Sequence, residues 1–252
     1  MPTALITGAS GGIGLELARV FALQGFDLVL VARNEKRLKE IAQELKGVRV
    51  QVLASDLSRP DAPGEVFAAA PTLDVLVNNA GFGVFGKFAQ APLAEQLSIM
   101  QLNMAALVAL TGLYLPGMLA AKTGRICNVA STAAFQPGPL MAIYYATKAF
   151  VLSFSEAIAN ELKGSGVTVT ALCPGPTTSG FQERAKMEDS GLVKGKKIMD
   201  ARTVAQAGYR GTMAGKTIVI PGFKNNLLAR SIGFMPRSIV TDTVRKMQEK
   251  VQ

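Results

Sequence analysis

Seven short, β-rich runs alternate with helix-like segments along the chain, and this alternation constrains the fold more than any other feature. Each run is almost continuously apolar, as expected of parallel strands that are buried on both faces. Strands separated by helical segments favour a parallel sheet with helices on both sides. We therefore predict an α/β fold, a doubly wound seven-stranded parallel sheet in a single domain over residues 1–252. The seven runs are TALITGA, DLVLVAR, RVQVLASDL, DVLVNNA, GRICNVAS, VTVTALCPG and TIVIPG.

The amino-acid composition argues against several kinds of functional site. The chain has no histidine and two cysteines, Cys127 and Cys173, both inside strand-like runs. A zinc site, a histidine-based triad and a disulfide framework therefore lack their usual residues, and we expect no metal. Acid–base chemistry must fall to Tyr, Lys, Asp or Glu. The first predicted strand starts at about Thr3, which leaves no room for a secretion signal, so we expect a cytoplasmic protein.

The first predicted strand leads into TGASGGIG, residues 7–14, whose glycines open a helix that we expect to run to about Leu23. Glycine lets the backbone turn sharply and approach a pyrophosphate, and the N–H groups of a helix N-terminus stabilise the anion. A glycine-rich turn is often only a turn, but its position between the first strand and the first helix favours a Rossmann dinucleotide site. The expected contacts are Gly8, Ser10, Gly12, Ile13 and Gly14.

The second predicted strand ends in Val31, Ala32, Arg33 and Asn34. An acid at this point would accept the ribose hydroxyls of NAD, and none is present. The guanidinium of Arg33 suits the additional 2′-phosphate of NADP. A solvated arginine at the start of a loop is the simpler alternative. The absence of an acid favours NADP independently of the role of Arg33. We therefore predict NADP (NADPH) as the cofactor.

These motifs and others further along make the chain similar to the short-chain dehydrogenase/reductase family from end to end. TGASGGIG resembles the family's TGxxxGxG motif, and NNAG (Asn78 to Gly81) resembles its fourth-strand signature. PGPTTS (Pro174 to Ser179) resembles the loop that holds the nicotinamide carboxamide. The resemblance implies hydride transfer between NADPH and a carbonyl carbon. It adds to the expected cofactor contacts Asp56, which would face the adenine, and Leu57, Asn79, Ala80, Gly81, Tyr144, Lys148, Pro174, Gly175, Thr177 and Ser179.

Two adjacent tyrosines, Tyr144 and Tyr145, lie four and three residues before Lys148, and both spacings bring a side chain near the lysine on a helix. The residues alone leave this choice open. The family's Y-x-x-x-K spacing selects Tyr144, and so does its interval from Ser131. The resemblance makes Tyr144 the proton donor, with Ser131 bonding the substrate oxygen and Asn103 holding a relay water. Lys148 would lower the pKa of the Tyr144 phenol, and Tyr145 would be a packing or pocket residue.

The substrate is less well defined by the sequence. FGVF (residues 82–85) and AAFQPGPLMA (residues 133–142) are mostly apolar. They favour a small or lipid-like apolar ketone, aldehyde, alcohol or acyl substrate. Residues 181–200 are polar and contain glycine, which is typical of a lid that closes over substrate. The alternative function is an NADPH-binding sensor or scaffold with little turnover.

The run between Glu95 and Lys122 carries no charge and is long enough to span a bilayer. Because it contains polar residues and lies between two strand patterns, we interpret it as a buried crossover helix rather than a transmembrane segment. The sheet covers only one side of such a helix, so we expect its outer side, with residues such as Leu110, to meet another subunit. This predicts a homodimer or homotetramer.

The net charge of +9 raises the question of a nucleic-acid partner. The basic residues are dispersed without interleaved aromatic residues, so we expect no nucleic-acid binding. Residues 224–252 form a C-terminal amphipathic extension with six basic and two acidic residues. It could contact a membrane surface peripherally or cover the pocket, but packing on its own domain or on a partner subunit is the preferred interpretation.

Overall fold

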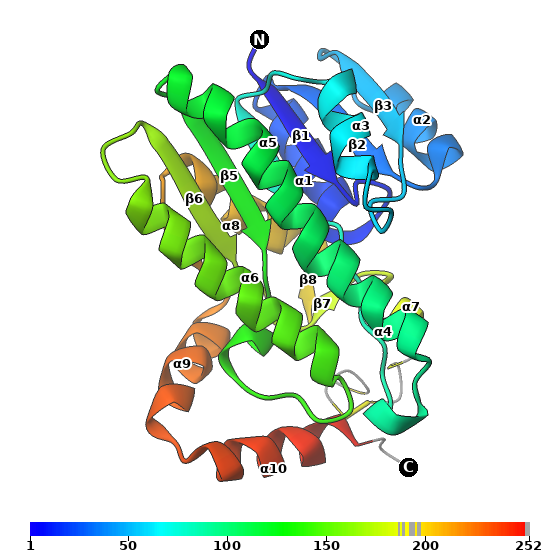
Figure 1. Ribbon diagram of the computed structural model, residues 1–252, viewed down its shortest axis with the longest axis vertical. Helices are drawn as coiled ribbons and strands as arrows, with labels where there is room; N and C mark the ends of the chain where they lie inside the picture. Colours follow the sequence, from blue (N-terminus) through cyan, green and yellow to red (C-terminus); the bar gives the residue numbers. More distant parts are fainter. Residues whose placement is uncertain (186, 188–189, 192–194, 196–197, 250–252) are drawn as a thin grey trace.

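All seven β-rich runs form strands of one sheet in the computed structural model, which describes residues 1–185, 187, 190–191, 195 and 198–249. The strands are β1 (Thr3–Thr7), β2 (Asp27–Ala32), β3 (Val50–Ala54), β4 (Val75–Asn78), β5 (Gly124–Val129), β6 (Val167–Leu172) and β9 (Ile218–Val219). Their order in space is β3-β2-β1-β4-β5-β6-β9, and every neighbouring pair is parallel (Figure 1). The predicted doubly wound α/β fold is confirmed.

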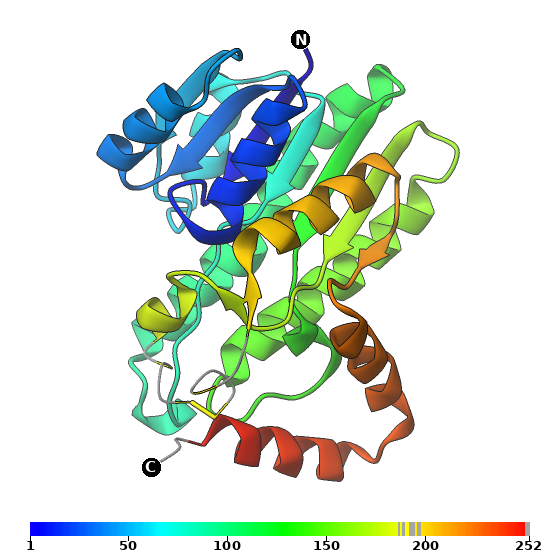
Figure 2. The ribbon, with the colours of Figure 1, turned by 180° about the vertical axis from the view of Figure 1, so that it is seen from behind.

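Helices cover both faces of the sheet, as the two opposite views show (Figures 1 and 2). One face is packed by α1 (Gly12–Leu23), α2 (Glu35–Glu44) and α8 (Ala201–Met213). The other face is packed by α3 (Ala62–Ala69), α4 (Leu93–Met100), α5 (Ala106–Ala120) and α6 (Ala142–Glu161).

The side chains of β1 alternate between the two faces, as a strand requires. Ala4 and Ile6 pack in the same core as Phe21 of α1, whereas Leu5 packs in the same core as Leu110 of α5. Ala4, Leu5, Ile6, Phe21 and Leu110 are all buried. Burial of a large aliphatic side chain stabilises a fold by about 1.5–3 kcal/mol, so a strand buried on both faces gains from a continuous apolar run.

The sheet has its topological switch point between β1 and β4. The helix that follows β1 lies on one face, and the helices that follow β4 lie on the other. A crevice therefore opens at the carboxyl ends of these two strands, which is where open α/β sheets bind their ligands. The loops that begin at Gly8 and Asn79 border this crevice.

The uncharged run forms one continuous helical stretch, Leu93–Ala120, in which α4 and α5 join through a π-helical turn at Gln101–Ala105. Within the described residues it is the one helix whose length and composition would allow it to cross a bilayer. Leu110 and Tyr114 on its inner side are buried, and Thr111 Oγ1 accepts a hydrogen bond of 3.2 Å from Asn78 Nδ2 of β4. These contacts make it part of the packed fold, as the sequence indicated.

The outer side of this helical run is apolar and exposed. Val108 is 37% exposed, and Leu113 and Leu119 are exposed with it. The sequence analysis was wrong about Leu110, which is 1% exposed and packs towards the sheet. Helical phase explains the error, because Leu110 and Tyr114 are four residues apart and share the inner side.

The predicted lid, residues 181–200, begins with α7 (Phe181–Ala185) and ends with β8 (Met199–Asp200). β8 pairs in parallel with β7 (Thr177–Thr178), in a small second sheet that the sequence did not predict. This pairing brings together the two ends of the segment. Residues 186, 188–189, 192–194 and 196–197 lie outside the described residues, so the lid stays a prediction.

The end of the chain forms an arm at the end of the molecule opposite the N-terminus (Figures 1 and 2). This C-terminal arm, residues 223–249, consists of α9 (Phe223–Ser231), a 3₁₀ turn (Ile232–Phe234) and α10 (Arg237–Gln248). Val240 and Val244 of α10 are buried in a cluster with Met141 and Tyr145. The arm therefore packs on its own domain through one side of α10.

Candidate active site

A cavity of about 1030 Å³ lies at the carboxyl ends of the central strands, between the loop after β1 and the C-terminal arm. Most of the predicted site residues line it, although the sequence spreads them over more than 170 positions. They are Gly8, Ser10, Gly12, Ile13, Arg33, Asp56, Leu57, Asn79, Ala80, Gly81, Ser131, Tyr144, Lys148, Pro174, Gly175, Thr177 and Ser179. The two others, Gly14 and Asn103, do not line the cavity.

The loop after β1 forms a close backbone cradle. Gly8 and Gly12 have positive φ values of 67° and 53°, which glycine adopts at little cost. A Cβ atom at Gly8 would lie 2.8 Å from Asn79 Nδ2, so a side chain has no room there. α1 follows with no capping side chain at Gly11 and no acidic residue in its first turn. The free N–H groups of that turn make an anion-binding site.

Gly14→Ala is expected to destabilise the protein, because the new Cβ would collide with the carbonyl oxygen of Gly8 and the amide of Asn79. Overpacking of this kind costs about 1–3 kcal/mol and should lower the melting temperature by several degrees. Gly11→Ala is the matched control, since nothing lies within 4 Å of its Cβ position and its φ is −175°. Equal melting temperatures for the two variants would contradict this packing.

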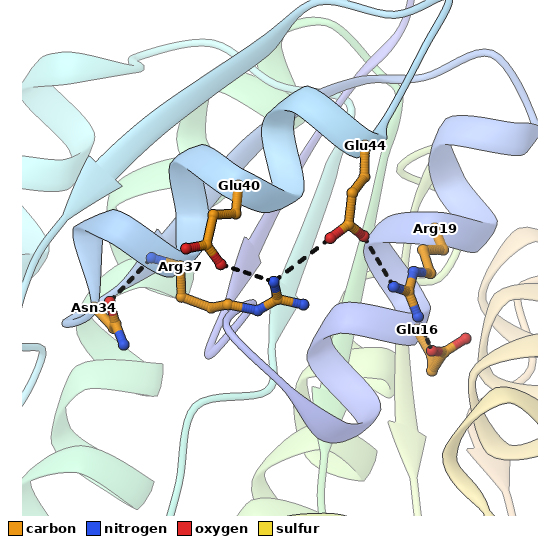
Figure 3. A network of polar contacts seen from close by, with 6 residues as sticks. All are labelled: Glu16, Arg19, Asn34, Arg37, Glu40 and Glu44. Carbon is orange, nitrogen blue, oxygen red and sulfur yellow. Dashed lines mark hydrogen bonds and ion pairs between the residues drawn. The ribbon is translucent and has the colours of Figure 1, made fainter.

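The end of β2 is fixed by a helix cap. Asn34 Oδ1 accepts a hydrogen bond of 3.0 Å from the backbone N–H of Arg37, which caps α2 (Figure 3). The strand therefore stops at Ala32 and the helix starts at Glu35. Arg33 lies at this junction, in the cavity wall.

Arg19 and Arg37 have ion-pair partners, whereas Arg33 has none among the described residues. Arg37 contacts Glu40 at 2.9 Å and Glu44 at 3.5 Å, and Arg19 contacts Glu44 at 3.0 Å (Figure 3). The Arg19–Glu44 pair joins α1 to α2, and the two pairs of Arg37 lie within α2. Arg33 is exposed and forms no ion pair with any residue that the structure describes. Its guanidinium is available to an anion in the cavity.

Asp56 follows β3 and accepts two hydrogen bonds from Ser58, at 2.7 Å from Oγ and 3.1 Å from N. Burial acts to raise the pKa of this carboxyl, but the Ser58 hydrogen bonds and the charges of Arg33 and Arg184 lower it below its usual value. Asp56 is therefore an anionic hydrogen-bond acceptor in the cavity wall.

Asn103 lies in the π-helical turn, and the turn explains its orientation. The wider turn directs a buried amide towards the loop after β4 instead of continuing the α-helical phase. Asn103 Oδ1 accepts from the backbone N–H of Phe82 at 3.1 Å, and Nδ2 donates to Phe82 O at 3.0 Å and to Thr147 Oγ1 at 3.1 Å. These bonds tie the loop to α6. The structure thus gives Asn103 a positioning role, and the relay water stays a prediction.

Ser131, Tyr144 and Lys148 share one wall of the cavity. Ser131 follows β5, and its Oγ accepts a hydrogen bond of 3.1 Å from the N–H of Ala133. Tyr144 and Lys148 are one turn apart on α6. Lys148 is buried, and its Nζ donates a hydrogen bond of 2.6 Å to Val129 O. The end of β5 and the first turns of α6 therefore bring together a hydroxyl, a phenol and an ammonium group.

The titration of these groups differs from the sequence-based expectation. Burial raises the pKa of Tyr144 to about 12, although the Ser131 side chain opposes this. Burial lowers the pKa of Lys148 to about 8. Lys148 Nζ lies 5.8 Å from the Tyr144 ring centroid and is hydrogen-bonded to Val129 O, so burial outweighs any lowering of the phenol pKa by this cation. Near neutrality the Tyr144 phenol therefore keeps its proton and lies beside a cation.

Tyr145 has different surroundings from Tyr144. Its ring is buried and packs with Met141, Val240 and Val244. A Cβ at Gly138 would collide with this ring, so the loop before α6 lies directly against it. Tyr145 also borders the cavity. It has the packing and pocket-lining position that we predicted.

Several cavity residues were not predicted as site residues. Arg184 of α7 has its guanidinium carbon 4.2 Å from the Phe82 ring centroid. It is exposed at the cavity, where partial burial and repulsion from Arg33 lower the pKa of its guanidinium. Leu228 and Ile232 of the C-terminal arm extend the apolar wall. Only the placement of Arg184 inside the predicted lid hinted at such a role.

The chain matches the family model described as short chain dehydrogenase over residues 2–189. It is similar to a short-chain dehydrogenase from Sphingobium yanoikuyae in complex with NADPH, with a TM-score of 0.83 and 34% identity over 93% of this chain and 95% of that one. It is also similar to the bulky-bulky ketone specific alcohol dehydrogenase from Comamonas testosteroni, with a TM-score of 0.79 and 31% identity over 93% and 94% of the two chains.

A third similarity is to a longer protein, the very-long-chain 3-oxoacyl-CoA reductase of Phaeosphaeria nodorum. The two sequences are 33% identical over 219 residues. The match covers 82% of this chain and 64% of the relative, so this chain spans less than two thirds of that protein.

Proposed function

Because the chain belongs to the short chain dehydrogenase family of oxidoreductases, we propose that it is an NADPH-dependent reductase of apolar carbonyl compounds, which also oxidises the corresponding alcohols. The observation that carries the proposal is one cavity bordered by a phosphate-type glycine cradle, by Arg33, which forms no ion pair within the described part of the chain, and by the Ser131, Tyr144, Lys148 group. One bound dinucleotide could contact all of these, with its nicotinamide beside Tyr144.

The residues present fit NADPH. The cradle at Gly8 and Gly12 admits no side chain, which suits close approach of a pyrophosphate. Arg33 and Arg184 both border the cavity, and two guanidinium groups favour a ligand with an additional phosphate. The ordinary NAD determinant, an acid directly after β2, is absent. The NADPH complex of the Sphingobium relative supports the same assignment.

Bound NADPH would supply a hydride to the carbonyl carbon. The phenol of Tyr144 would donate its proton to the carbonyl oxygen as negative charge develops there. Ser131 Oγ would donate a hydrogen bond to the same oxygen, and the cation of Lys148 would stabilise the phenolate that remains. Asn103 would hold the loop after β4 against α6 and so keep Tyr144 in position.

An apolar substrate is supported by the wall beyond Tyr144. Met141, Phe181 and Ile232 line the cavity there and belong to one apolar cluster. Burial of a ligand's hydrocarbon against such a wall is favourable, and a sugar would leave hydroxyl groups without partners. The names of the relatives, a bulky ketone dehydrogenase and a very-long-chain oxoacyl reductase, agree with this substrate class.

The cofactor preference can be reversed. Replacing Ala32 by Asp and Arg33 by Ala should weaken NADPH binding by about tenfold or more and strengthen NADH binding. The new carboxylate repels a 2′-phosphate and accepts ribose hydroxyls. Fluorescence titration of both cofactors measures the change. If the wild type already binds NADH as tightly as NADPH, the assignment to NADPH fails.

Assembly through the helical run Leu93–Ala120 is also proposed, because its outer side is apolar and exposed. Size-exclusion chromatography with light scattering should show a dimer or larger without detergent. Val108→Arg should shift the protein to a smaller species, since a two-fold contact brings two like charges together. Leu23→Arg, at a residue 75% exposed at the end of α1, is the control. A monomeric wild type would refute this assembly.

The alternative function, an NADPH-binding sensor or scaffold, predicts tight cofactor binding without turnover. A panel of apolar ketones, aldehydes and 3-ketoacyl thioesters tests the proposal through NADPH consumption. Steady consumption with at least one class, matched by alcohol formed, supports a reductase. Tight NADPH binding without consumption across the panel supports the sensor.

A further inference from the structure

The C-terminal arm exposes several large apolar side chains within a short stretch of the chain. Phe234 is 91% exposed and Phe223 is 83% exposed. Leu227, Met235 and Ile239 are also exposed. All five lie within seventeen residues, on α9, α10 and the turn between them. A soluble surface seldom leaves so many large apolar groups together without a partner.

The same arm carries cations without partners. Arg230, Arg237 and Lys246 are exposed, and none of them forms an ion pair with a described residue. Arg245 is paired with Glu249 at 3.2 Å, and Asp242, the acid of α10, forms no ion pair with a residue that the structure describes. The arm therefore combines exposed apolar groups with an excess of free positive charge.

The inner side of the arm borders the cavity. Leu228, Ala229, Ile232 and Met247 line it, and Phe223 both borders it and is exposed. The arm thus separates the apolar end of the cavity from the solvent beyond it, and the whole arm lies at one end of the molecule (Figures 1 and 2). A surface that held the outer side of the arm would lie next to the cavity.

We propose that the outer side of the C-terminal arm docks on an anionic lipid surface, with Phe234 and Ile239 in the interface and Arg230 and Arg237 against the lipid headgroups. Interfacial helices bind in this way, through buried apolar area and attraction between cations and anionic lipid. Docking would place the cavity at a membrane, where lipid-like carbonyl compounds concentrate.

A second copy of the chain is the competing occupant, and the charges disfavour it. A two-fold contact between two arms would set the same surface of each copy against the other, so each set of cations, Arg230, Arg237 and Lys246, would face an arm with the same excess of positive charge. Such a contact sets like charges against each other. An anionic bilayer complements both the apolar and the charged groups of the arm.

The test is co-sedimentation of the full chain, without cofactor, with vesicles of phosphatidylcholine alone or mixed with phosphatidylglycerol. We expect binding to the anionic vesicles at least about tenfold tighter than to the neutral ones, and weaker binding at high salt. Phe234→Ser with Ile239→Ser should reduce binding to the anionic vesicles about tenfold or more. Arg230→Gln with Arg237→Gln should reduce binding to the anionic vesicles and leave binding to neutral vesicles unchanged.

Leu23→Ser and Lys163→Gln, exposed positions outside the arm, are the matched controls and should bind as the wild type does. Equal binding to the two kinds of vesicle, or arm variants that bind as tightly as the controls, would overturn the proposal. So would light scattering that shows the Phe234/Ile239 variant breaking up a wild-type oligomer while neither protein binds vesicles. Because the assay needs neither NADPH nor substrate, failure of the proposed reductase activity would not affect it.

Discussion

Tyr144→Phe is expected to lower carbonyl reduction by about 10²–10⁴-fold, the range that a positioned general acid contributes. The phenol, which we propose as the proton donor, borders the cavity beside Ser131 and Lys148. Burial holds its pKa at about 12, so it carries its proton throughout the neutral range. Phenylalanine keeps the ring and removes the proton, and NADPH binding measured by fluorescence should change little.

Tyr145→Phe is the matched control for that result. Tyr145 packs against Met141, Val240 and Val244, and these contacts involve the ring rather than a transferred proton. We expect the variant to keep most of its turnover. Equal losses in steady-state turnover for the two variants would contradict the assignment of Tyr144.

Lys148→Met is expected to lower turnover by about 10²–10⁴-fold, because the remaining phenolate would lose its neighbouring cation. The variant should also change how stability depends on pH. Burial lowers the pKa of Lys148 from 10.5 to about 8, so the folded protein holds this proton less tightly than the unfolded chain does. The buried cation therefore destabilises the fold below about pH 8.

The sign of the pH effect follows from these two values. Between about pH 8 and pH 10.5 the unfolded chain stays protonated while the folded protein does not, so rising pH favours folding of the wild type. Methionine does not titrate, so it contributes no pH dependence to the stability of the variant. The melting temperature of Lys148→Met relative to the wild type should therefore fall by about 2–4 °C or more between pH ~7 and pH ~10. A difference that stays constant with pH would show that Lys148 titrates as an ordinary exposed lysine.

The fold was largely predictable because its strands are buried on both faces and cannot be mistaken for amphipathic elements. Leu5 and Ile6 face opposite cores, and such runs recur seven times between helical segments. The β7–β8 pair was not predictable, since two residues on each side form no pattern. Leu110 was misplaced because a helix with hardly any charge gives no sign of which side faces the sheet.

The candidate site was predictable where a motif fixed a residue and unpredictable where tertiary packing did. The positive φ values of Gly8 and Gly12 explain the glycines of the first loop. The contact between Arg184 and Phe82 joins residues about a hundred positions apart, which no local pattern encodes. The pKa of Tyr144 is raised by burial, which depends on tertiary packing, so the spacing on a helix could not give the direction of the shift.

Transfer of a labelled hydride tests the account most directly. The protein is incubated with an apolar ketone and NADPH deuterated at the transferable nicotinamide position, and the alcohol is analysed by mass spectrometry. We predict deuterium on the carbinol carbon with the wild type and almost none with Tyr144→Phe. Tight binding of NADPH by the wild type, with no labelled alcohol from any apolar ketone, aldehyde or 3-ketoacyl thioester, would contradict a reductase and leave a cofactor-binding sensor or scaffold.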